Sequence, residues 1–272
     1  MPPLLLTLTE KSIPGGMEVF SQQIKKVFPE IQIVGRETLK EKSGKKIEWP
    51  LLRDVQHGKR LQEYVAALPI KKEIIIANGM NAWAFTPSPS DYRLITAMHG
   101  TFIGLAENGY SKTDPVYWRM RHIYSAFEKK SAINANLCVA NSLFTQGEIW
   151  RYYGCNSKII EPPIDSSIFS AGSKAAAQKK VGWEKEKKHV LFVGNPTYSK
   201  GFDTYRALAT LHPEWTFHAI CAPHSFHPHQ RIQLHPAVSH SELVYFYRAA
   251  DVLVFPSRYE GFGFVPLEAL AS

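Results

Sequence analysis

Residues Glu260 to Glu268 spell E-G-F-G-F-V-P-L-E, and this stretch carries the most specific signal in the sequence. The apolar run at 252–255 before it has the length of a buried strand, and residues 264–271 have a helical pattern. Two carboxylates eight positions apart therefore flank a glycine loop that leads from a strand into a helix. Glycine lets the backbone approach a ligand closely, and the free amides of a first helical turn favour a phosphate. The stretch predicts a strand, loop and helix unit that binds a phosphorylated ligand.

Apolar runs of strand length alternate with helical patterns along the whole chain. The expected strands are residues 4–8, 31–34, 73–77, 94–98, 137–140, 159–160, 190–193, 215–221 and 252–255. The expected helices are residues 15–28, 51–68, 116–130, 142–154, 202–211, 241–249 and 264–271. This alternation predicts an α/β protein with parallel sheets and right-handed crossovers, arranged as two Rossmann-like units.

The polar stretch at 170–188 has little core-forming character and is the expected boundary between the units. We therefore expect a first domain at 1–163, a linker region at 164–188 and a second domain at 189–272. The second domain has few strands and stops at Ser272 directly after a helix, whereas a doubly wound half normally has more. We expect it to be incomplete, because the sequence is a fragment, a truncated reading frame or a naturally shortened protein.

The composition is that of a basic globular protein, with 272 residues and a net charge of +8. A solvated surface is the favoured explanation of the basic residues, and an anionic membrane surface is the second. Nucleic acid is not an expected partner, because the sequence has no zinc-finger, RNP or helix-turn-helix pattern. Three widely spaced cysteines and the lack of a signal peptide or long apolar stretch predict a cytoplasmic protein. Peripheral attachment to the inner face of the membrane is the alternative.

Residues 250–272, A-D-V-L-V-F-P-S-R-Y-E-G-F-G-F-V-P-L-E-A-L-A-S, resemble the E-x7-E region of the retaining glycosyltransferases of family 4, also called group 1. Other segments agree in order. They are P-G-G-M-E at 14–18, M-H-G-T at 98–101, V-A-N-S-L-F-T at 139–145, I-I-E-P-P-I-D at 159–165 and F-V-G-N-P-T-Y-S-K-G at 192–201. The resemblance implies the GT-B fold, in which two Rossmann-like domains face each other. The acceptor then binds mainly to the first domain and the nucleotide sugar mainly to the second.

The phosphate loop of this family matches residues 192–201, and Lys200 is the expected cation. A fixed ammonium stabilises the negative charge that develops on the leaving diphosphate. The sequence departs from the family at Asn195, directly after Gly194, where an arginine is usual. Asparagine can donate a hydrogen bond but carries no charge. Arg258 is a candidate to compensate for this loss.

The resemblance also assigns the two carboxylates and one histidine. Glu260 is expected to face the hydroxyls of the donor sugar, and Glu268 to accept hydrogen bonds from the ribose. His99 matches the histidine that reaches the donor sugar near the reacting carbon, so His99, Glu260 and Lys200 are the catalytic candidates. The expected donor-binding residues are Gly16, Gly194, Asn195, Lys200, Gly261, Phe262, Gly263, Phe264 and Glu268. Each of these residues has a plain structural alternative, such as a turn glycine or a surface charge.

No cofactor and no metal are expected, because backbone amides and Lys200 would neutralise the diphosphate. The segment at 218–229 contains four histidines, but its prolines and irregular spacing argue against tetrahedral metal binding. The expected partners are a nucleoside-diphosphate sugar and a glycan or lipid-linked acceptor.

The sequence thus predicts a retaining glycosyltransferase of cell-surface polysaccharide or lipopolysaccharide synthesis. The alternative is a non-catalytic GT-B-like module that binds a nucleotide or a partner protein. An NAD-dependent oxidoreductase is disfavoured, because no G-x-G-x-x-G follows the first strand.

Overall fold

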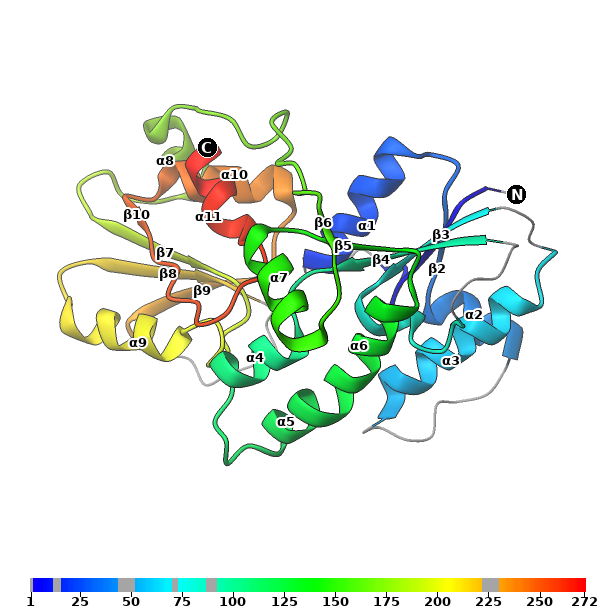
Figure 1. Cartoon of the computed structure of the whole chain (residues 1–272). Helices are drawn as coiled ribbons and strands as arrows, with labels where there is room; N and C mark the ends of the chain where they lie inside the picture. The colour runs from blue at the N-terminus through cyan, green and yellow to red at the C-terminus, as the bar shows by residue number, and fades with distance from the viewer. Residues whose placement is uncertain (1, 12–15, 44–51, 70–72, 87–91, 222–229) are drawn as a thin grey trace. The chain divides into compact units, whose positions relative to one another are not determined.

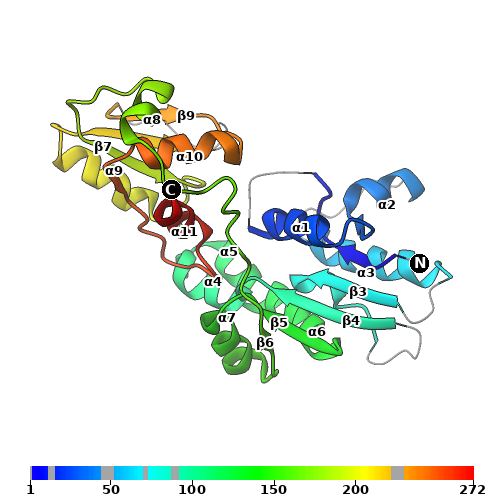
Figure 2. The ribbon, with the colours of Figure 1, turned by 90° about the horizontal axis from the view of Figure 1, so that it is seen from above.

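The computed structural model describes residues 2–11, 16–43, 52–69, 73–86, 92–221 and 230–272 (Figures 1 and 2). The chain folds as two compact units. The first consists of Met1–Glu107 and Ser111–Pro162, and the second of Pro163–Ser272 with the short segment Asn108–Tyr110. Each unit is built around a parallel sheet, which confirms the expected α/β class.

The first unit contains a six-stranded sheet with the order β2-β1-β3-β4-β5-β6. Its strands are β1 (Leu4–Leu6), β2 (Gln32–Val34), β3 (Glu73–Asn78), β4 (Tyr92–Met98), β5 (Leu137–Ala140) and β6 (Lys158–Ile159). In the register, Leu5 of β1 lies opposite Ile33 on one side and Ile76 on the other. All three residues of β1 are fully buried, as expected for a strand that is covered on both faces.

Helices cover both faces of this sheet, and Figure 1 shows α1 on one side with α3 and α6 on the other. The helices are α1 (Gly16–Val27), α2 (Arg36–Ser43), α3 (Arg53–Ala66), α4 (Phe102–Gly109), α5 (Pro115–Trp118), α6 (Ser125–Asn134) and α7 (Leu143–Glu148). A 3₁₀ turn, η2 (Gly79–Ala82), and two π-helical segments, η3 (Arg119–Tyr124) and η4 (Ile149–Tyr153), join them. Leu61 and Val65 of α3 pack on Leu4 and Leu6, which shows how the apolar face of this helix builds the core.

The second unit contains a four-stranded parallel sheet with the order β10-β7-β8-β9. Its strands are β7 (His189–Val193), β8 (Thr216–Ile220), β9 (Ile232–His235) and β10 (Val252–Leu253). Its helices are α8 (Lys174–Val181), α9 (Phe202–Leu211), α10 (His240–Ala249) and α11 (Phe264–Ala271). Consecutive residues of β7 point to opposite faces of the sheet and pack in different cores. Phe192 packs with Tyr205 of α9, whereas Leu191 packs with Tyr247 of α10.

The structure corrects the expected linker. Residues 164–188 belong to the second unit and contain α8, which Ser173 caps by accepting from Ala176 N at 3.3 Å. Ala177 and Trp183 are buried in the core that α10 also lines. The sequence does not predict this helix, because its buried face consists of small and polar residues. Such residues do not produce a strong helical periodicity of apolar side chains.

Five elements of the described chain were not expected, namely α2, α4, α8, β9 and the 3₁₀ turn η2. Helix α2 is rich in charged residues, and β9 has only one buried residue, Ile232, so neither has a clear apolar pattern. The expected helix at 116–130 is confirmed as a helical stretch, but η3 interrupts its α-helical geometry between α5 and α6. The expected cap of α7 is also confirmed, since Ser142 Oγ accepts from Thr145 N at 3.0 Å.

Candidate active site

The loop between β7 and α9 holds Lys200 at the carboxyl edge of the second sheet. Its backbone turns at Thr197, whose carbonyl accepts from Lys200 N and Phe202 N, both at 3.2 Å. Gly201 follows with a φ of 68°, and a Cβ atom at this position would lie 2.0 Å from the carbonyl oxygen of Pro256. Only glycine permits both this conformation and this contact. The loop is therefore pressed against the segment that follows β10.

That segment, residues 254–263, is tied to the Lys200 loop by hydrogen bonds. Arg258 N donates to Ser199 O at 2.8 Å, and Arg258 Nη1 donates to Tyr198 O at 2.6 Å. The Ser257 hydroxyl lies 3.3 Å from Ser199 O and 2.9 Å from Glu260 Oε1. Parallel strands place their following loops on one edge of a sheet, so the two loops meet although 60 residues separate Lys200 from Glu260.

Lys200 and Glu260 form an ion pair through Nζ and Oε1. The hydroxyl of Ser257 contacts the same carboxylate oxygen. About a third of the Lys200 side chain and a quarter of the Glu260 side chain stay exposed, at 34% and 26%, so a ligand can reach both. A phosphate oxygen would compete with Glu260 for the ammonium, while a sugar hydroxyl would donate to the carboxylate. The pair can thus hold two chemically different parts of one ligand.

Arg258, the candidate to compensate for the uncharged Asn195, has partners of its own within the second unit. Its guanidinium makes a two-pronged ion pair with Asp203, with Nη1–Oδ1 at 2.7 Å and Nη2–Oδ2 at 2.8 Å. Its Cζ also lies 3.8 Å from the centre of the Tyr198 ring. The Asp203 carboxylate raises the pKa of Arg258, and Arg258 in turn lowers the pKa of Asp203. Asn195 is exposed, and its carbonyl accepts from Thr197 N at 2.8 Å.

The glycine turn before α11 has the expected geometry. Gly263 is the N-cap residue with a φ of 85°, and α11 begins at Phe264. The rings of Phe262 and Phe264 pack edge to face at 5.1 Å. Pro266 lies in the first turn of α11, where its missing N–H costs little. Gly261, Phe262, Gly263 and Phe264 therefore lie directly beside Glu260 in the chain, at the amino end of the helix.

Glu268 has a different environment from Glu260. It is buried, with 4% of its surface exposed, and Tyr247 donates a hydrogen bond to Glu268 Oε2 at 2.8 Å. Burial raises the pKa of Glu268, and the Tyr247 hydrogen bond partly opposes this shift. A ribose would have to share this carboxylate with Tyr247, a partner that no local sequence pattern indicates.

In the first unit, His99 follows β4 and contacts two residues. Its Nε2 lies 3.2 Å from Asn78 Oδ1, and its ring packs edge to face on Phe20 with centroids 4.9 Å apart. Burial lowers the pKa of His99 to about 4, so the imidazole is neutral at pH 7. Gly16 is the first residue of α1. The glycine loop before it, at 12–15, lies outside the described residues.

The structure brings Lys200, Glu260 and residues 261–264 together within the second unit, and it places His99 in the first. Sequence reasoning missed Ser257, Tyr247 and Asn78. Ser257 lies three residues before Glu260, so a search for hydroxyls near the carboxylate would have found it. Tyr247 and Asn78 are 21 residues from their partners, and no local pattern connects them.

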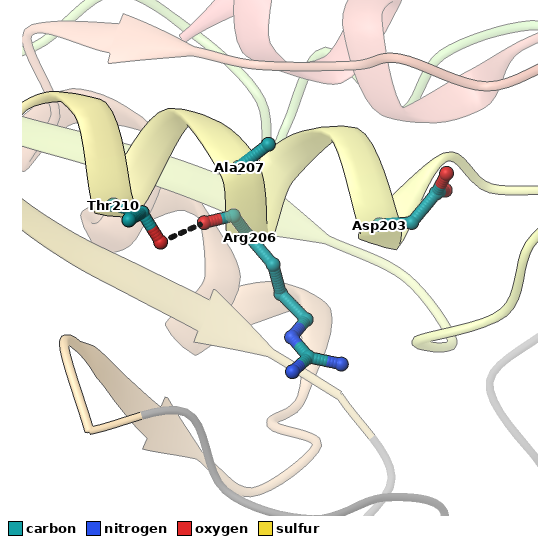
Figure 3. A pocket seen from close by; sticks show the side chains of 4 residues that line it. All are labelled: Asp203, Arg206, Ala207 and Thr210. Carbon is teal, nitrogen blue, oxygen red and sulfur yellow. Dashed lines mark hydrogen bonds between the residues drawn. The ribbon is translucent and has the colours of Figure 1, made fainter.

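Other features add little to the site. A shallow hollow runs along one side of α9 and is lined by Asp203, Arg206, Ala207 and Thr210 (Figure 3). Among the described residues, no group of three or more histidine, cysteine, aspartate or glutamate side chains is arranged to hold a metal ion. Most of the histidine segment at 218–229 lies outside those residues. None of the helices in the described ranges is long and apolar enough to cross a membrane.

Comparisons with solved structures show the same fold over the whole chain. Sucrose-phosphate synthase from Thermosynechococcus elongatus superposes with a TM-score of 0.74 at 16% identity, over 99% of this chain and 78% of that one. HepE from Anabaena, solved with UDP-glucose, superposes with a TM-score of 0.69 at 17% identity, over 100% of this chain and 78% of that one. These matches confirm the two-unit GT-B fold class.

Comparisons of sequence point to one family. The model of the family described as "Glycosyl transferases group 1" matches residues 173–272. The lipopolysaccharide core biosynthesis mannosyltransferase LpsB of Rhizobium meliloti is 32% identical over 139 residues, which are 44% of this chain and 37% of that protein. The chain spans about a third of the length of the curated relatives that it matches. Residues 173–272 are thus similar to the glycosyl transferases of group 1.

Proposed function

We propose that this chain is a retaining glycosyltransferase that moves a sugar from a nucleoside-diphosphate donor to a glycan or lipid-linked acceptor. The observation that carries the proposal is the Lys200–Glu260 ion pair at the carboxyl edge of the second sheet, inside the segment that matches the family. HepE was solved with UDP-glucose, which supports a nucleotide sugar as the donor. LpsB acts in lipopolysaccharide core synthesis, which supports a cell-surface glycan as the product.

In this mechanism the donor exchanges the internal ion pair for its own groups. Lys200 moves from Glu260 to the diphosphate and stabilises the charge that grows as the sugar bond breaks. Glu260 then accepts from a sugar hydroxyl, and Ser257 holds the carboxylate through its Oγ contact. The amides of residues 261–264 and the amino end of α11 favour the phosphate. The reacting carbon has oxocarbenium character, as in other glycosyl chemistry. No step of this scheme uses a cofactor or a metal.

The test combines a binding measurement with a turnover measurement. Calorimetric titration with UDP, GDP and ADP identifies the base, and release of the nucleotide from the matching sugar donor measures turnover. Lys200→Ala removes a charge-assisted contact worth about 2–3 kcal/mol, so we expect binding of the nucleotide to weaken roughly 30- to 150-fold. Lys187→Ala is the matched control, because Lys187 pairs with Glu184 on the surface. Equal binding by the Lys200→Ala variant and the wild type would refute the assigned role.

A non-catalytic nucleotide-binding module is the second candidate. Three observations favour it: Asn195 brings no charge, Arg258 is committed to Asp203, and Tyr247 occupies one oxygen of Glu268. Nucleotide binding without any release of nucleotide from sugar donors, with and without acceptor, would select this candidate.

The acceptor side of the proposal concerns the surface of the first unit. Trp118 and Trp150 are large apolar residues that are more than half exposed, at 54% and 60%, and Arg151 follows Trp150 directly. Such aromatic and basic residues suit a peripheral contact with anionic lipid at the inner face of the membrane. Co-sedimentation with vesicles should rise with the fraction of phosphatidylglycerol. Equal binding to neutral vesicles would reject this part of the proposal.

A further inference from the structure

Glu128 is a buried carboxyl group on α6 that holds the first turn of α4. Only 5% of its surface is exposed. Its Oε2 accepts from Phe102 N at 2.7 Å, and the hydroxyl of Tyr153 forms a hydrogen bond with the same oxygen. Phe102 is the first residue of α4, so Glu128 satisfies one of the amides that a helix leaves unpaired at its amino end. Glu128 therefore ties α6 and η4 to the start of α4.

A second buried carboxyl group, Glu148 of α7, holds the residue before Phe102. Its Oε2 lies 2.9 Å from Thr101 Oγ1, and 7% of its surface is exposed. Thr101 Oγ1 also accepts from Gly104 N at 3.0 Å, which closes the same helical turn. The two carboxyl groups thus fix consecutive residues, and these directly follow His99 and Gly100 at the end of β4.

The titratable and charged side chains around Glu128 come from three neighbouring elements and from α6 itself. They are Glu148 of α7, Tyr153 of η4, Cys138 of β5, Tyr124 of η3 and, on α6, the exposed Lys129 and Lys130. Glu128 forms no ion pair with any residue in the described ranges. A buried carboxylate without a cation is costly to ionise, and a second carboxylate nearby adds to the cost.

Glu128 is therefore a neutral acid at pH 7. Burial, and to a smaller extent the charge of Glu148, raise its pKa from 4.5 to about 8. The hydrogen bonds from Tyr153 and Phe102 N lower the pKa and only partly offset this rise.

We propose that Glu128 is a positioning residue whose proton keeps the turn between His99 and α4 closed. In the closed turn, Glu128 is a neutral acid among buried groups. When the turn opens, water reaches the carboxyl group, which then loses its proton as an exposed glutamate does. Opening of the turn and release of the proton are therefore linked, and the pH sets how often the turn opens.

This linkage fixes the direction of the pH dependence. Between pH 4.5 and about pH 8, the closed turn binds one proton more than the open turn. The population of the open turn should therefore rise about tenfold per pH unit over this interval and level off above it. The closed turn is most stable in mild acid and loses stability as the pH rises toward 8.

The protonation of Glu128 is measured by carbon-13 spectra of the chain labelled at the glutamate carboxyl groups. One signal, which Glu128→Gln removes, should titrate at about pH 8. Glu161→Gln is the control, because Glu161 is exposed and its replacement should leave this signal unchanged. If the signal of Glu128 titrates below about pH 6, the closed turn holds a charged carboxylate and the proposal fails.

Hydrogen exchange at the amide of Phe102 measures the opening of the turn. After correction for the intrinsic exchange rate, its protection in the wild type should fall about 100-fold from pH 6 to pH 8. In Glu128→Gln the side chain is neutral at every pH and still accepts from Phe102 N, so the protection should not depend on pH. Glu161→Gln should follow the wild type. A wild-type protection that stays constant with pH would overturn the proposal, and this measurement needs no variant.

Turnover tests the link to the candidate active site, and this part rests on the proposed function. Glu128→Ala should lower kcat about tenfold or more with little change in KM, because the turn that carries His99 loses its anchor. Glu128→Gln should restore most of the loss, since a neutral acceptor again holds Phe102 N.

The possible failures are distinguishable. If the chain turns over no donor, the proposed function fails, while the carboxyl titration and the exchange of Phe102 still decide the role of Glu128. If Glu128→Ala turns over as fast as the wild type, the positioning role is wrong even where the exchange of Phe102 follows the expected trend.

Discussion

At the residue scale, single atoms decide whether the two loops of the second unit can meet. Gly201 has no Cβ, and this absence lets Pro256 O approach where a Cβ would lie 2.0 Å away. Lys200 precedes this contact in the chain and pairs with Glu260, so the close approach positions the ion pair as well. A glycine that looked like a plain turn residue in the sequence is thus required by a contact with a segment 55 residues away.

Replacing Gly201 by alanine should lower the stability of the fold in two ways, through backbone strain and through a steric clash. Gly201→Ala adds both the strain of a positive φ and a clash with backbone, whereas Gly182→Ala adds only the strain, because nothing lies within 4 Å of a Cβ there. We expect Gly182→Ala to lower the free energy of unfolding by about 1–3 kcal/mol, and Gly201→Ala to lower it clearly more. Urea unfolding followed by tryptophan fluorescence measures both. Equal losses of unfolding free energy in the two variants would show that the clash with Pro256 O is easily relieved.

At the element scale, three strands of the second unit are joined by a chain of three histidines, of which His189 and His218 are buried. His189 of β7, His218 of β8 and His235 of β9 are neighbours, with His189 Nδ1 2.9 Å from His218 Nε2 and His218 Nδ1 3.1 Å from His235 Nε2. His189 Nε2 must donate to the carbonyl of Glu184 at 2.7 Å. His218 Nε2 can then donate to His189 Nδ1, and His235 Nε2 to His218 Nδ1, so the chain of hydrogen bonds has one direction. Trp183 stacks on His218 with ring centroids 3.7 Å apart.

This histidine chain predicts a loss of stability in acid. Burial, and then the neighbouring His235 and His189, lower the pKa of His218 to about 3, and burial also lowers the pKa of His235. Unfolded histidines take up protons below about pH 6.5, while folded His218 and His235 do not until a lower pH. Stability that is present above pH 6.5 is therefore lost as the pH falls toward 3, by up to about 1.4 kcal/mol per pH unit for each ring.

The measurement is urea unfolding at intervals between pH 8 and pH 5, where most carboxylates stay charged. His218→Leu should flatten the slope in this range, although it lowers stability at pH 8 by leaving the partners of His218 unpaired. His212→Gln is the control, because His212 lies on the surface beside Glu214. An unchanged slope in the His218→Leu variant would contradict the assignment.

At the scale of the whole molecule, both units place their candidate residues at the carboxyl edge of a parallel sheet. His99 follows β4 and Asn78 ends β3 in the first unit, while the Lys200 loop follows β7 in the second. This is the edge at which open α/β sheets bind ligands. If the nucleotide binds to the second unit, as we propose, its binding should affect the two units differently.

Hydrogen exchange should show where a nucleoside diphosphate binds. At saturating nucleotide, amides in residues 194–201 and 257–268 should exchange more slowly, because the ligand contacts these loops and stabilises the folded state. Amides of β1 and β3 in the first unit should change little. The Lys200→Ala variant provides the control at the same nucleotide concentration. If exchange slowed only in the first unit, our assignment of the nucleotide to the second unit would be wrong.

The fold class, most strands and helices, and the glycine turn before α11 could be predicted from local sequence patterns. Apolar periodicity and the glycine turn at 261–263 are local signals, so they predicted α9 and α11 with the bounds that the structure has. Other features became visible only in the folded chain: α8 belongs to the core of the second unit, and Asp203 holds Arg258. Glu268 and His99 likewise have distant partners, Tyr247 and Asn78. The physical reason is that burial and pairing depend on which distant segments a sheet brings together. A pattern of neighbouring residues carries no record of those contacts.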